Sequence, residues 1–249
     1  MPKTIAIANQ KGGVGKTFLV FHLAHFFRET GARVLAVDLD PQGNLTLSFC
    51  LGRGMSLEGC PVAEVFEKER LRLTELEEGL WLCGADIQLA RYEALSSGVG
   101  VYFKLKKALS RLKEPVDYVL LDCPPSLGLF SLSAFVAAHK LIVPLRAEVF
   151  SVSGLGDLLN VVQEVRENIN PGLEVTGLVL NALDQRTRVA RETLRELEEE
   201  ANLPVLATIP ASIKVEESLR AGRPLWQFDP AHKMASLLQE ALKRVAQHL

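Results

Sequence analysis

The feature that most constrains the fold of this chain is a glycine-rich stretch at residues 9–17, between a predicted strand and a predicted helix. It follows the apolar run of residues 4–8, precedes the helical pattern of residues 18–27, and reads Asn-Gln-Lys-Gly-Gly-Val-Gly-Lys-Thr. In such a connection the backbone N–H groups and the helix N-terminus converge on one point, and glycines let phosphate oxygens approach the backbone closely. The stretch therefore predicts a phosphate-binding loop.

Side chains in this loop have separate predicted roles in binding a nucleoside triphosphate. Lys16 is placed to reach the β and γ phosphates, and the Thr17 hydroxyl is placed to coordinate Mg²⁺. The strict pattern G-x-x-x-x-G-K-[ST] fails, because Gln10 occupies its first glycine position, and Lys11 follows as an additional cation. The candidate nucleotide-binding residues of the loop are Gly12, Gly13, Val14, Gly15, Lys16, Thr17 and Phe18.

Apolar runs of strand length alternate with helical patterns along the 249 residues, which is typical of βαβ units. Strands are expected at residues 3–9, 33–38, 79–83, 117–122, 140–145, 174–181 and 205–208, and helices at 16–29, 61–68, 85–93, 99–113, 127–138, 152–169, 187–201 and 231–247. No linker, low-complexity tract or repeat divides the chain. We expect a single P-loop domain over residues 1–249, an α/β fold with a doubly wound, mostly parallel sheet and helices on both faces.

An acidic motif follows the second predicted strand. Asp38 and Asp40 come at its carboxyl end, where right-handed crossovers also place the phosphate-binding loop. Carboxylates beside a triphosphate can bind the water ligands of Mg²⁺ or orient an attacking water. Pro41 and Gly43 predict that the following segment is a tight turn rather than the start of a helix.

A second acidic motif ends the predicted strand at residues 117–122. This aliphatic strand ends in Asp122, an arrangement in which the carboxylate holds Mg²⁺ through water. Pro124 and Pro125 follow almost directly, lack backbone N–H donors and force the chain out of the sheet. The motif therefore predicts a second switch segment that senses the γ-phosphate.

Taken together, these motifs resemble those of the deviant Walker ATPases, the class that includes ParA, MinD and the nitrogenase iron protein. Within this class the chain looks most like a ParA-type partition ATPase. The resemblance implies that Lys11 reaches across a dimer interface to the partner's nucleotide, and that Asp40 positions or activates the hydrolytic water. It implies that Asp38 supports the metal. The catalytic candidates are thus Lys11, Lys16 and Asp40, and the metal candidates are Thr17, Asp38 and Asp122.

The resemblance extends through the second half of the chain. Asn181 ends a predicted strand where family members place an asparagine against the adenine, and Pro210 begins a loop to residue 224 that resembles the segment beside the base. Two positions depart from the family. Phe18 stands where most members have a second threonine, so a hydroxyl contact to phosphate is lost, and Ala211 stands where an arginine is frequent.

DNA binding must come from a local patch, because the net charge of −2 gives no bulk attraction to nucleic acid. By resemblance, basic residues of two segments form that patch. They are Arg186, Arg188, Arg191, Lys214 and Arg220. No aromatic residues interleave with them, which favours double-stranded over single-stranded DNA. Alternatively, the arginines of the predicted helix at 187–201 pair with the glutamates of the same helix.

The implied function is an ATP-dependent switch that forms a homodimer and binds DNA non-specifically in the ATP state. It would segregate chromosome or plasmid DNA, and a ParB-like partner would stimulate hydrolysis. No apolar stretch is long enough to span a bilayer, so we expect a cytoplasmic, nucleoid-associated protein without stable membrane association.

Three classes of alternative remain, namely a MinD-like regulator, an orphan ParA-like ATPase, and a metabolic or cofactor-assembly enzyme on the same fold. A MinD-like membrane-associated division-site regulator would need a basic amphipathic terminus, but residues 237–249 have few cations and no aromatic side chain. An orphan ParA-like ATPase would position another cargo. An iron–sulfur carrier would need close cysteines, whereas those here are isolated and are predicted to be reduced structural thiols, and an ATP-dependent ligase would not need Lys11. The cysteines are Cys50, Cys60, Cys83 and Cys123.

Overall fold

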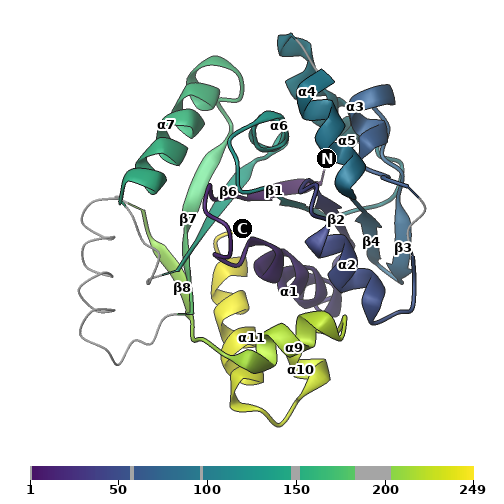
Figure 1. The fold of residues 1–249 in the computed structure, drawn as a ribbon. Helices are drawn as coiled ribbons and strands as arrows, with labels where there is room; N and C mark the ends of the chain where they lie inside the picture. The colour runs from purple at the N-terminus through teal and green to yellow at the C-terminus, as the bar shows by residue number, and fades with distance from the viewer. Residues whose placement is uncertain (1, 57–58, 96–97, 147–151, 183–202) are drawn as a thin grey trace.

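One sheet forms the centre of the computed structural model, which describes residues 2–56, 59–95, 98–146, 152–182 and 203–249. Within these residues its strand order is β3-β4-β2-β5-β1-β6-β7-β8 (Figure 1). All neighbouring strands are parallel except the edge strand β3, which is antiparallel to β4. The strands are β1 (Lys3–Ile7), β2 (Val34–Asp38), β3 (Thr74–Glu77), β4 (Leu80–Cys83), β5 (Tyr118–Asp122), β6 (Lys140–Arg146), β7 (Glu174–Asn181) and β8 (Val205–Ile209).

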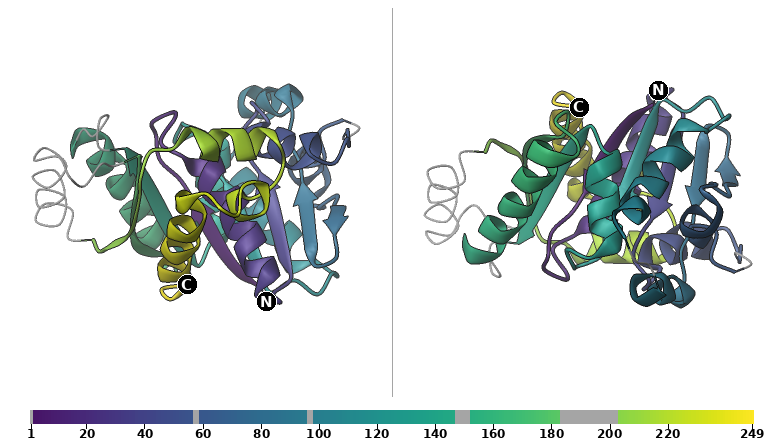
Figure 2. Two further views of the ribbon diagram at one scale, coloured as in Figure 1. Left: turned by 90° about the horizontal axis from the view of Figure 1, so that it is seen from below. Right: turned by 90° about the horizontal axis from the view of Figure 1, so that it is seen from above.

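Helices cover both faces of the sheet (Figure 2), which confirms the predicted doubly wound α/β fold. The described helices are α1 (Lys16–Glu29), α2 (Asn44–Leu51), α3 (Ala63–Lys68), α4 (Ala90–Leu95), α5 (Lys104–Ser110), α6 (Leu129–Ala137), α7 (Val152–Asn168), α9 (Ile213–Arg220), α10 (Leu225–Phe228) and α11 (Lys233–Ala246), with short 3₁₀ turns at Ile87–Leu89 and Val99–Phe103. Alternate residues of β1 enter different cores. Ile5 and Ile7 pack on the side of α1 and α11, whereas Ala6 packs on the side of α6 and α7.

The predicted strands are all present, each with ends within two residues of the prediction. The helix predicted at 187–201 lies outside the described residues. All four cysteines are buried free thiols, as predicted. No helix in the described ranges has both the length and the apolar character that a membrane span requires.

The segment after Asp40 was predicted to be a tight turn rather than the start of a helix, and helix α2 shows that this prediction was wrong. Gly43 precedes the helix in the left-handed conformation with φ 64°, and α2 begins at the next residue. The Asp38 carboxylate accepts the backbone N–H of Thr46, in the first turn of α2, at 2.9 Å. A carboxylate there satisfies a donor that has no partner inside the helix and interacts favourably with the helix dipole. The cap comes from outside the helix, so the local sequence does not reveal it.

Two further elements also differ from the prediction. Strand β3 has the sequence Thr-Glu-Leu-Glu, whose charged residues gave no strand signal but are tolerated at a sheet edge. Helix α9 lies within residues 209–224, which were predicted to be a loop. Pro224 ends this region and stands directly before α10. Both α9 and α10 are short, and short helices give a weak periodic pattern.

Two glycines bring the ends of α2 and α9 into direct backbone contact. A Cβ atom on Gly52 would lie 2.1 Å from the Ala221 carbonyl oxygen and 2.7 Å from the Gly222 Cα. A Cβ on Gly222 would lie 2.5 Å from the Gly52 nitrogen and 3.0 Å from the Ser48 carbonyl oxygen. Neither position has room for a side chain, because the atoms in the way belong to the backbone.

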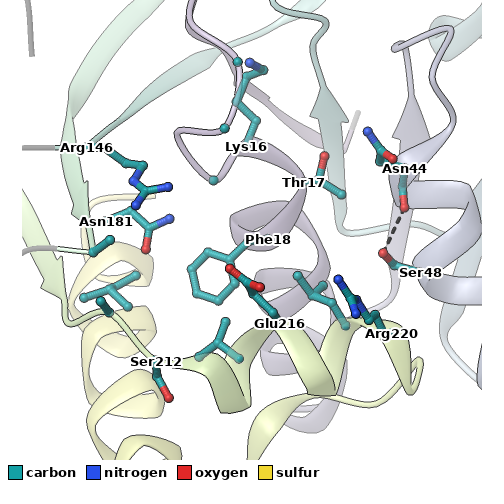
Figure 3. A pocket seen from close by; sticks show the side chains of 18 of the residues that line it. Lys16, Thr17, Phe18, Asn44, Ser48, Arg146, Asn181, Ser212, Glu216 and Arg220 are labelled. Carbon is teal, nitrogen blue, oxygen red and sulfur yellow. Dashed lines mark hydrogen bonds between the residues drawn. The ribbon is translucent and has the colours of Figure 1, made fainter. Parts of the chain in front are cut away.

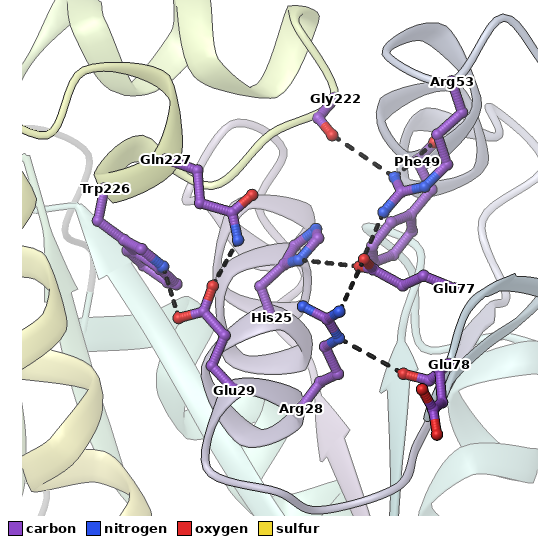
Figure 4. A network of polar contacts seen from close by, with 10 residues as sticks. All are labelled: His25, Arg28, Glu29, Phe49, Arg53, Glu77, Glu78, Gly222, Trp226 and Gln227. Atoms are coloured by element: carbon purple, nitrogen blue, oxygen red, sulfur yellow. Dashed lines mark hydrogen bonds and ion pairs between the residues drawn. The ribbon is translucent and has the colours of Figure 1, made fainter.

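Polar contacts beside the contact between Gly52 and Gly222 connect α1, β3 and the end of α2 (Figure 4). Glu77 of β3 forms ion pairs with Arg53 at 3.0 Å and with Arg28 at 3.1 Å. The Arg53 guanidinium also donates to the carbonyl oxygen of Phe49 at 3.0 Å. His25 is buried beside Glu77, and neither of its ring nitrogens has a hydrogen-bond partner among the residues that the structure describes. Burial lowers the pKa of His25 to about 3, so its 3.6 Å approach to Glu77 is not an ion pair at neutral pH.

We expect Gly52→Ala to lower the free energy of unfolding by about 2 kcal/mol, because the new methyl group collides with backbone. Gly52 has φ −69°, which alanine adopts without strain, so the loss reports the contact alone. Gly156 in α7 has nothing within 4 Å of its Cβ position. Gly156→Ala is the matched control and should stabilise the protein by about 0.5–1 kcal/mol. Urea unfolding of both variants measures this, and equal stability of the two would contradict the contact.

We expect His25→Leu to become more stable than the wild type as the pH falls. The unfolded chain takes up a proton at His25 near pH 6.5 and the folded chain only near pH 3, so this histidine destabilises the fold increasingly below pH 6.5. The stability difference between variant and wild type should therefore grow by about 1–2 kcal/mol between pH 7 and pH 5. Urea unfolding at both pH values tests this. His248→Leu, at an exposed site, is the control, and a difference that does not change with pH would refute the prediction.

Candidate functional site

A cleft of about 700 Å³ lies where the phosphate-binding loop, α2 and α9 meet (Figure 3). The loops after β5, β7 and β8 also reach it. Candidate residues from separate parts of the sequence line it, namely Gly12, Gly13, Gly15, Lys16, Thr17, Phe18, Asp40, Asn181, Pro210 and Arg220. The structure therefore brings together most of the predicted nucleotide contacts in one place.

The phosphate-binding loop is held in shape by its own backbone carbonyls. The Lys16 ammonium, which is buried, donates to the carbonyl oxygens of Asn9 at 3.1 Å and Lys11 at 3.0 Å. The Asn9 side chain accepts the Lys11 N–H at 2.9 Å and donates to the Pro144 carbonyl oxygen at 2.8 Å, which ties the loop to β6. Sequence reasoning assigned no role to Asn9, although it begins the loop motif. Burial lowers the pKa of Lys16, and the nearby Asp122 carboxylate opposes this shift.

Asn181 lies directly against the glycines of the loop. Its side-chain nitrogen donates to the carbonyl oxygen of Val14, a buried residue, at 3.2 Å. A Cβ on Gly15 would lie 2.1 Å from the same nitrogen, and Gly15 has φ 99°, so only glycine fits. The end of β7 and the loop are therefore in contact, as the predicted role of Asn181 beside a nucleotide requires.

Asp122 has one satisfied and one unsatisfied carboxylate oxygen. The Thr17 hydroxyl donates to Oδ2 at 2.7 Å, whereas Oδ1 is buried and has no hydrogen-bond partner within the described part of the chain. Burial raises the pKa of Asp122 well above its ordinary value, and the Asp38 carboxylate on the neighbouring strand adds to this shift. An unsatisfied buried oxygen next to a hydroxyl fits a hydrated divalent cation, since hard cations take oxygen ligands.

Protein ligands alone do not complete a metal site here. The described residues contain no group of three or more His, Cys, Asp or Glu side chains that could hold a metal ion. Thr17 and Asp122 therefore fit a Mg²⁺ ion whose other ligands are water and phosphate oxygens, the usual arrangement for this ion with nucleotides.

Both oxygens of Asp38 are bound by neighbouring donors. Oδ1 accepts the Asp40 N–H at 3.1 Å, and Oδ2 accepts the N–H and the hydroxyl of Thr46 at 2.9 and 2.7 Å. Burial raises the pKa of Asp38 to about 6, while the Thr46 hydroxyl opposes the shift. These contacts show that Asp38 supports the backbone of the acidic motif. Its role in metal binding stays a prediction. Thr46 was missed because the start of α2 was missed.

Asp40 itself lines the cleft and is partly exposed. Its Oδ1 accepts the Gln42 N–H at 2.9 Å, and its carbonyl oxygen accepts the Gly43 N–H at 2.9 Å. The carboxylate is therefore oriented by the turn that follows it.

Of the remaining predicted residues, only Arg220 reaches the cleft among those that the structure describes. Lys11 is half-buried and does not line the cleft. Lys214 and Arg220 lie on α9, where Lys214 forms an ion pair with Glu217 at 2.8 Å and Arg220 is exposed at the edge of the cleft. The candidates Arg186, Arg188 and Arg191 lie outside the described residues.

Comparison with known proteins identifies the family. Residues 2–175 match the family model described as an AAA domain. The chain is 35% identical to the sporulation initiation inhibitor protein Soj of Bacillus subtilis over 252 residues, which cover 99% of each chain. It is 33% identical to the chromosome partitioning protein ParA of Caulobacter vibrioides, covering 91% of this chain and 87% of that protein. The chain belongs to the ParA/Soj family of partition ATPases.

A solved structure supports the same fold for this ParA/Soj family member. Cobyrinic acid a,c-diamide synthase from Mycobacterium smegmatis, with bound ATP analogue and magnesium, has a TM-score of 0.84 and 36% identity. The match covers 100% of this chain and 95% of that one.

Phe18 is the residue of the cleft that the sequence resemblance predicts to differ from the common family pattern. Figure 3 shows its ring between Asn181 and Glu216, yet it is only 6% exposed. The ring packs on the ring of His22 with centroids 4.6 Å apart, and a His22 ring nitrogen lies 2.9 Å from the Phe18 carbonyl oxygen. Burial lowers the pKa of His22 to about 4, so the imidazole is neutral and packs as an uncharged ring. Phe18 therefore adds packing where a threonine would add a hydroxyl.

We expect Phe18→Thr to destabilise the nucleotide-free protein by about 3 kcal/mol, because it removes a buried ring. Phe18→Leu keeps most of the apolar volume and should cost about 1 kcal/mol. Urea unfolding without nucleotide compares the two variants. A threonine variant as stable as the leucine variant would show that buried apolar volume at this position does not support the fold.

Proposed function

We propose that the chain is an ATP-dependent dimerising switch, built as one P-loop ATPase domain over residues 1–249. In its ATP state it binds double-stranded DNA without sequence preference and so drives segregation of chromosome or plasmid DNA. The observation that carries the proposal is the convergence of Lys16, Thr17 and Asp40 on one cleft, with the unsatisfied buried oxygen of Asp122 next to Thr17. Similarity to Soj and ParA over nearly the whole chain supports it.

In this proposal ATP occupies the cleft with its phosphates on the loop. Lys16 exchanges its two carbonyl partners for phosphate oxygens, while Asn181 and Pro210 contact the base. Mg²⁺, held at Thr17 and Asp122, would neutralise charge on the β and γ phosphates. The similar synthase structure contains a bound ATP analogue and magnesium, which supports binding of both to this chain.

Hydrolysis and dimerisation depend on the two residues that flank the phosphates. Asp40 orients the water that attacks the γ-phosphate, and its carboxylate is already fixed by the Gln42 N–H. Lys11 would cross to the nucleotide of a second copy. Its carbonyl oxygen holds Lys16 at 3.0 Å before nucleotide binds, so recruitment of Lys16 by phosphate also releases the backbone that carries Lys11.

DNA binding would use the basic residues of α9 together with Arg186, Arg188 and Arg191. Dimerisation doubles this surface, which raises affinity for a polyanion without new kinds of contact. A ParB-like partner would stimulate hydrolysis, which would return the protein to its weakly binding state. The protein would then act in the cytoplasm, on the nucleoid.

An ATP-dependent ligase is the second candidate function, because this chain is 36% identical to a solved structure of a diamide synthase. A ligase would couple ATP cleavage to an organic acid acceptor, and it would need neither DNA nor Lys11. A MinD-like regulator would bind lipid vesicles rather than DNA. A family member that positions another cargo would still bind DNA in the ATP state, so only the identity of its partner would distinguish it.

DNA binding with ATP, with ADP and without nucleotide tests the proposal. We expect affinity for a random DNA duplex to be at least about tenfold higher with ATP, because the dimer presents two basic surfaces. Asp40→Ala should keep or prolong this binding, Lys11→Ala should abolish it together with the dimer, and Arg188→Glu should weaken DNA binding in the intact dimer. Light scattering reports the dimer, and filter binding at several salt concentrations reports the DNA complex. Nucleotide-independent binding, or pelleting with lipid vesicles instead of DNA, would refute the switch.

A further inference from the structure

We propose that Thr46 is a positioning residue for hydrolysis, which acts through Asp38 to hold Asp40 in place. This inference deepens the proposed function and rests on the assignment of Asp40 to the attacking water. The hydrogen bonds of Thr46 carry the inference.

The Thr46 hydroxyl joins three structural elements. As donor it binds Asp38 Oδ2 at the end of β2 at 2.7 Å, and as acceptor it binds the Ala85 N–H, just beyond β4, at 2.9 Å. Its own backbone N–H, in the first turn of α2, donates to the same Asp38 oxygen at 2.9 Å. A hydroxyl has one proton to donate, so this group is committed to Asp38.

The contact fixes which way the Asp38 carboxylate is turned. With Oδ2 bound by both donors of Thr46, Oδ1 is directed to the Asp40 N–H, which it accepts at 3.1 Å. Asp38 is fully buried and is paired in register with Asp122 across β2 and β5. Mutual repulsion favours rotation of either carboxylate away from the other, and the Thr46 hydroxyl holds one of them in a single orientation.

The same region leaves the acidic motif little freedom to adjust. A Cβ on Gly43 would lie 2.9 Å from the Ala85 carbonyl oxygen, so the turn before α2 is packed against the residue that Thr46 also binds. Asp40 reaches the cleft from within this turn. Reaction rates fall steeply when a catalytic group is displaced from the reacting atoms. A small rotation of the Asp38 carboxylate should displace Asp40 and the attacking water, and so lower the rate of ATP turnover.

Removal of the hydroxyl tests the proposal. Thr46→Val should lower kcat for ATP by about tenfold or more while KM and the affinity for a fluorescent ATP analogue stay within about twofold, because ground-state binding does not use this contact. Thr46→Ser should restore kcat. Thr46→Ala is made in parallel, since it loses the hydroxyl without placing a new methyl group against Ala85 and covers the case in which the valine variant does not fold. Without nucleotide, amide exchange of residues 38–46 should accelerate in the valine or alanine variant.

Thr30→Val is the matched control. Its hydroxyl donates to the Phe27 carbonyl oxygen, also at 2.7 Å, at the far end of α1 and away from the cleft. This variant should lose a hydroxyl hydrogen bond of the same length without any change in kcat or in exchange at residues 38–46.

A double variant separates a positioning role from a general loss of structure. In an Asp40→Ala background, Thr46→Val should cause little further loss of residual turnover, because both changes act on one group. Wild-type kcat in the valine and alanine variants, a serine variant that does not recover, or full additivity with Asp40→Ala would overturn the inference. If Asp40→Ala itself hydrolyses ATP at the wild-type rate, the catalytic assignment in the proposed function fails. Loss of turnover in Asp40→Ala with none in Thr46→Val would refute the Thr46 inference alone.

Discussion

The site depends above all on two carboxylates that are buried side by side. Asp38 and Asp122 occupy paired positions on β2 and β5, so the parallel register brings their charges together without solvent to screen them. Such a pair persists only if donors surround it. Within the described residues, donors reach three of the four oxygens, from Asp40 and Thr46 on one side and from Thr17 on the other. The fourth oxygen, on Asp122, is left for a cation.

The surrounding structure follows from this arrangement. Helix α2 begins where it does because Asp38 accepts a donor from its first turn, and Thr17 is directed toward β5 by the Asp122 carboxylate. Lys16 is the nearest buried cation, yet it is engaged by backbone carbonyls rather than by either acid. The Lys16 ammonium, whose positive charge could balance Asp38 and Asp122, therefore lies against the phosphate-binding loop.

Sequence predicted those parts of the structure that depend on local pattern. The strands were predicted correctly because buried parallel strands are continuous apolar runs. The loop, Asp40, Asp122 and Asn181 were singled out because motif residues occupy fixed places at or just beyond the ends of such strands, and their roles stay predictions. Helix α2 was missed because its cap, Asp38, lies outside it, and Thr46 was missed with it. Strand β3 was missed because its pairing with β4 overrides a charged sequence. These misses involve contacts between segments that no local pattern records, whereas α9 and α10 were missed because short helices give a weak periodic pattern.

The glycine contact between α2 and α9 has a consequence for how such a cleft can change. Gly52 and Gly222 leave no space for a side chain, so the end of the helix that follows Asp40 and the end of the helix that lines the other side of the cleft cannot be spaced apart by substitution. The shape of the wall formed by α9 and the position of the acidic turn are therefore mechanically coupled, and a substitution that moves one of these helix ends should also move the other.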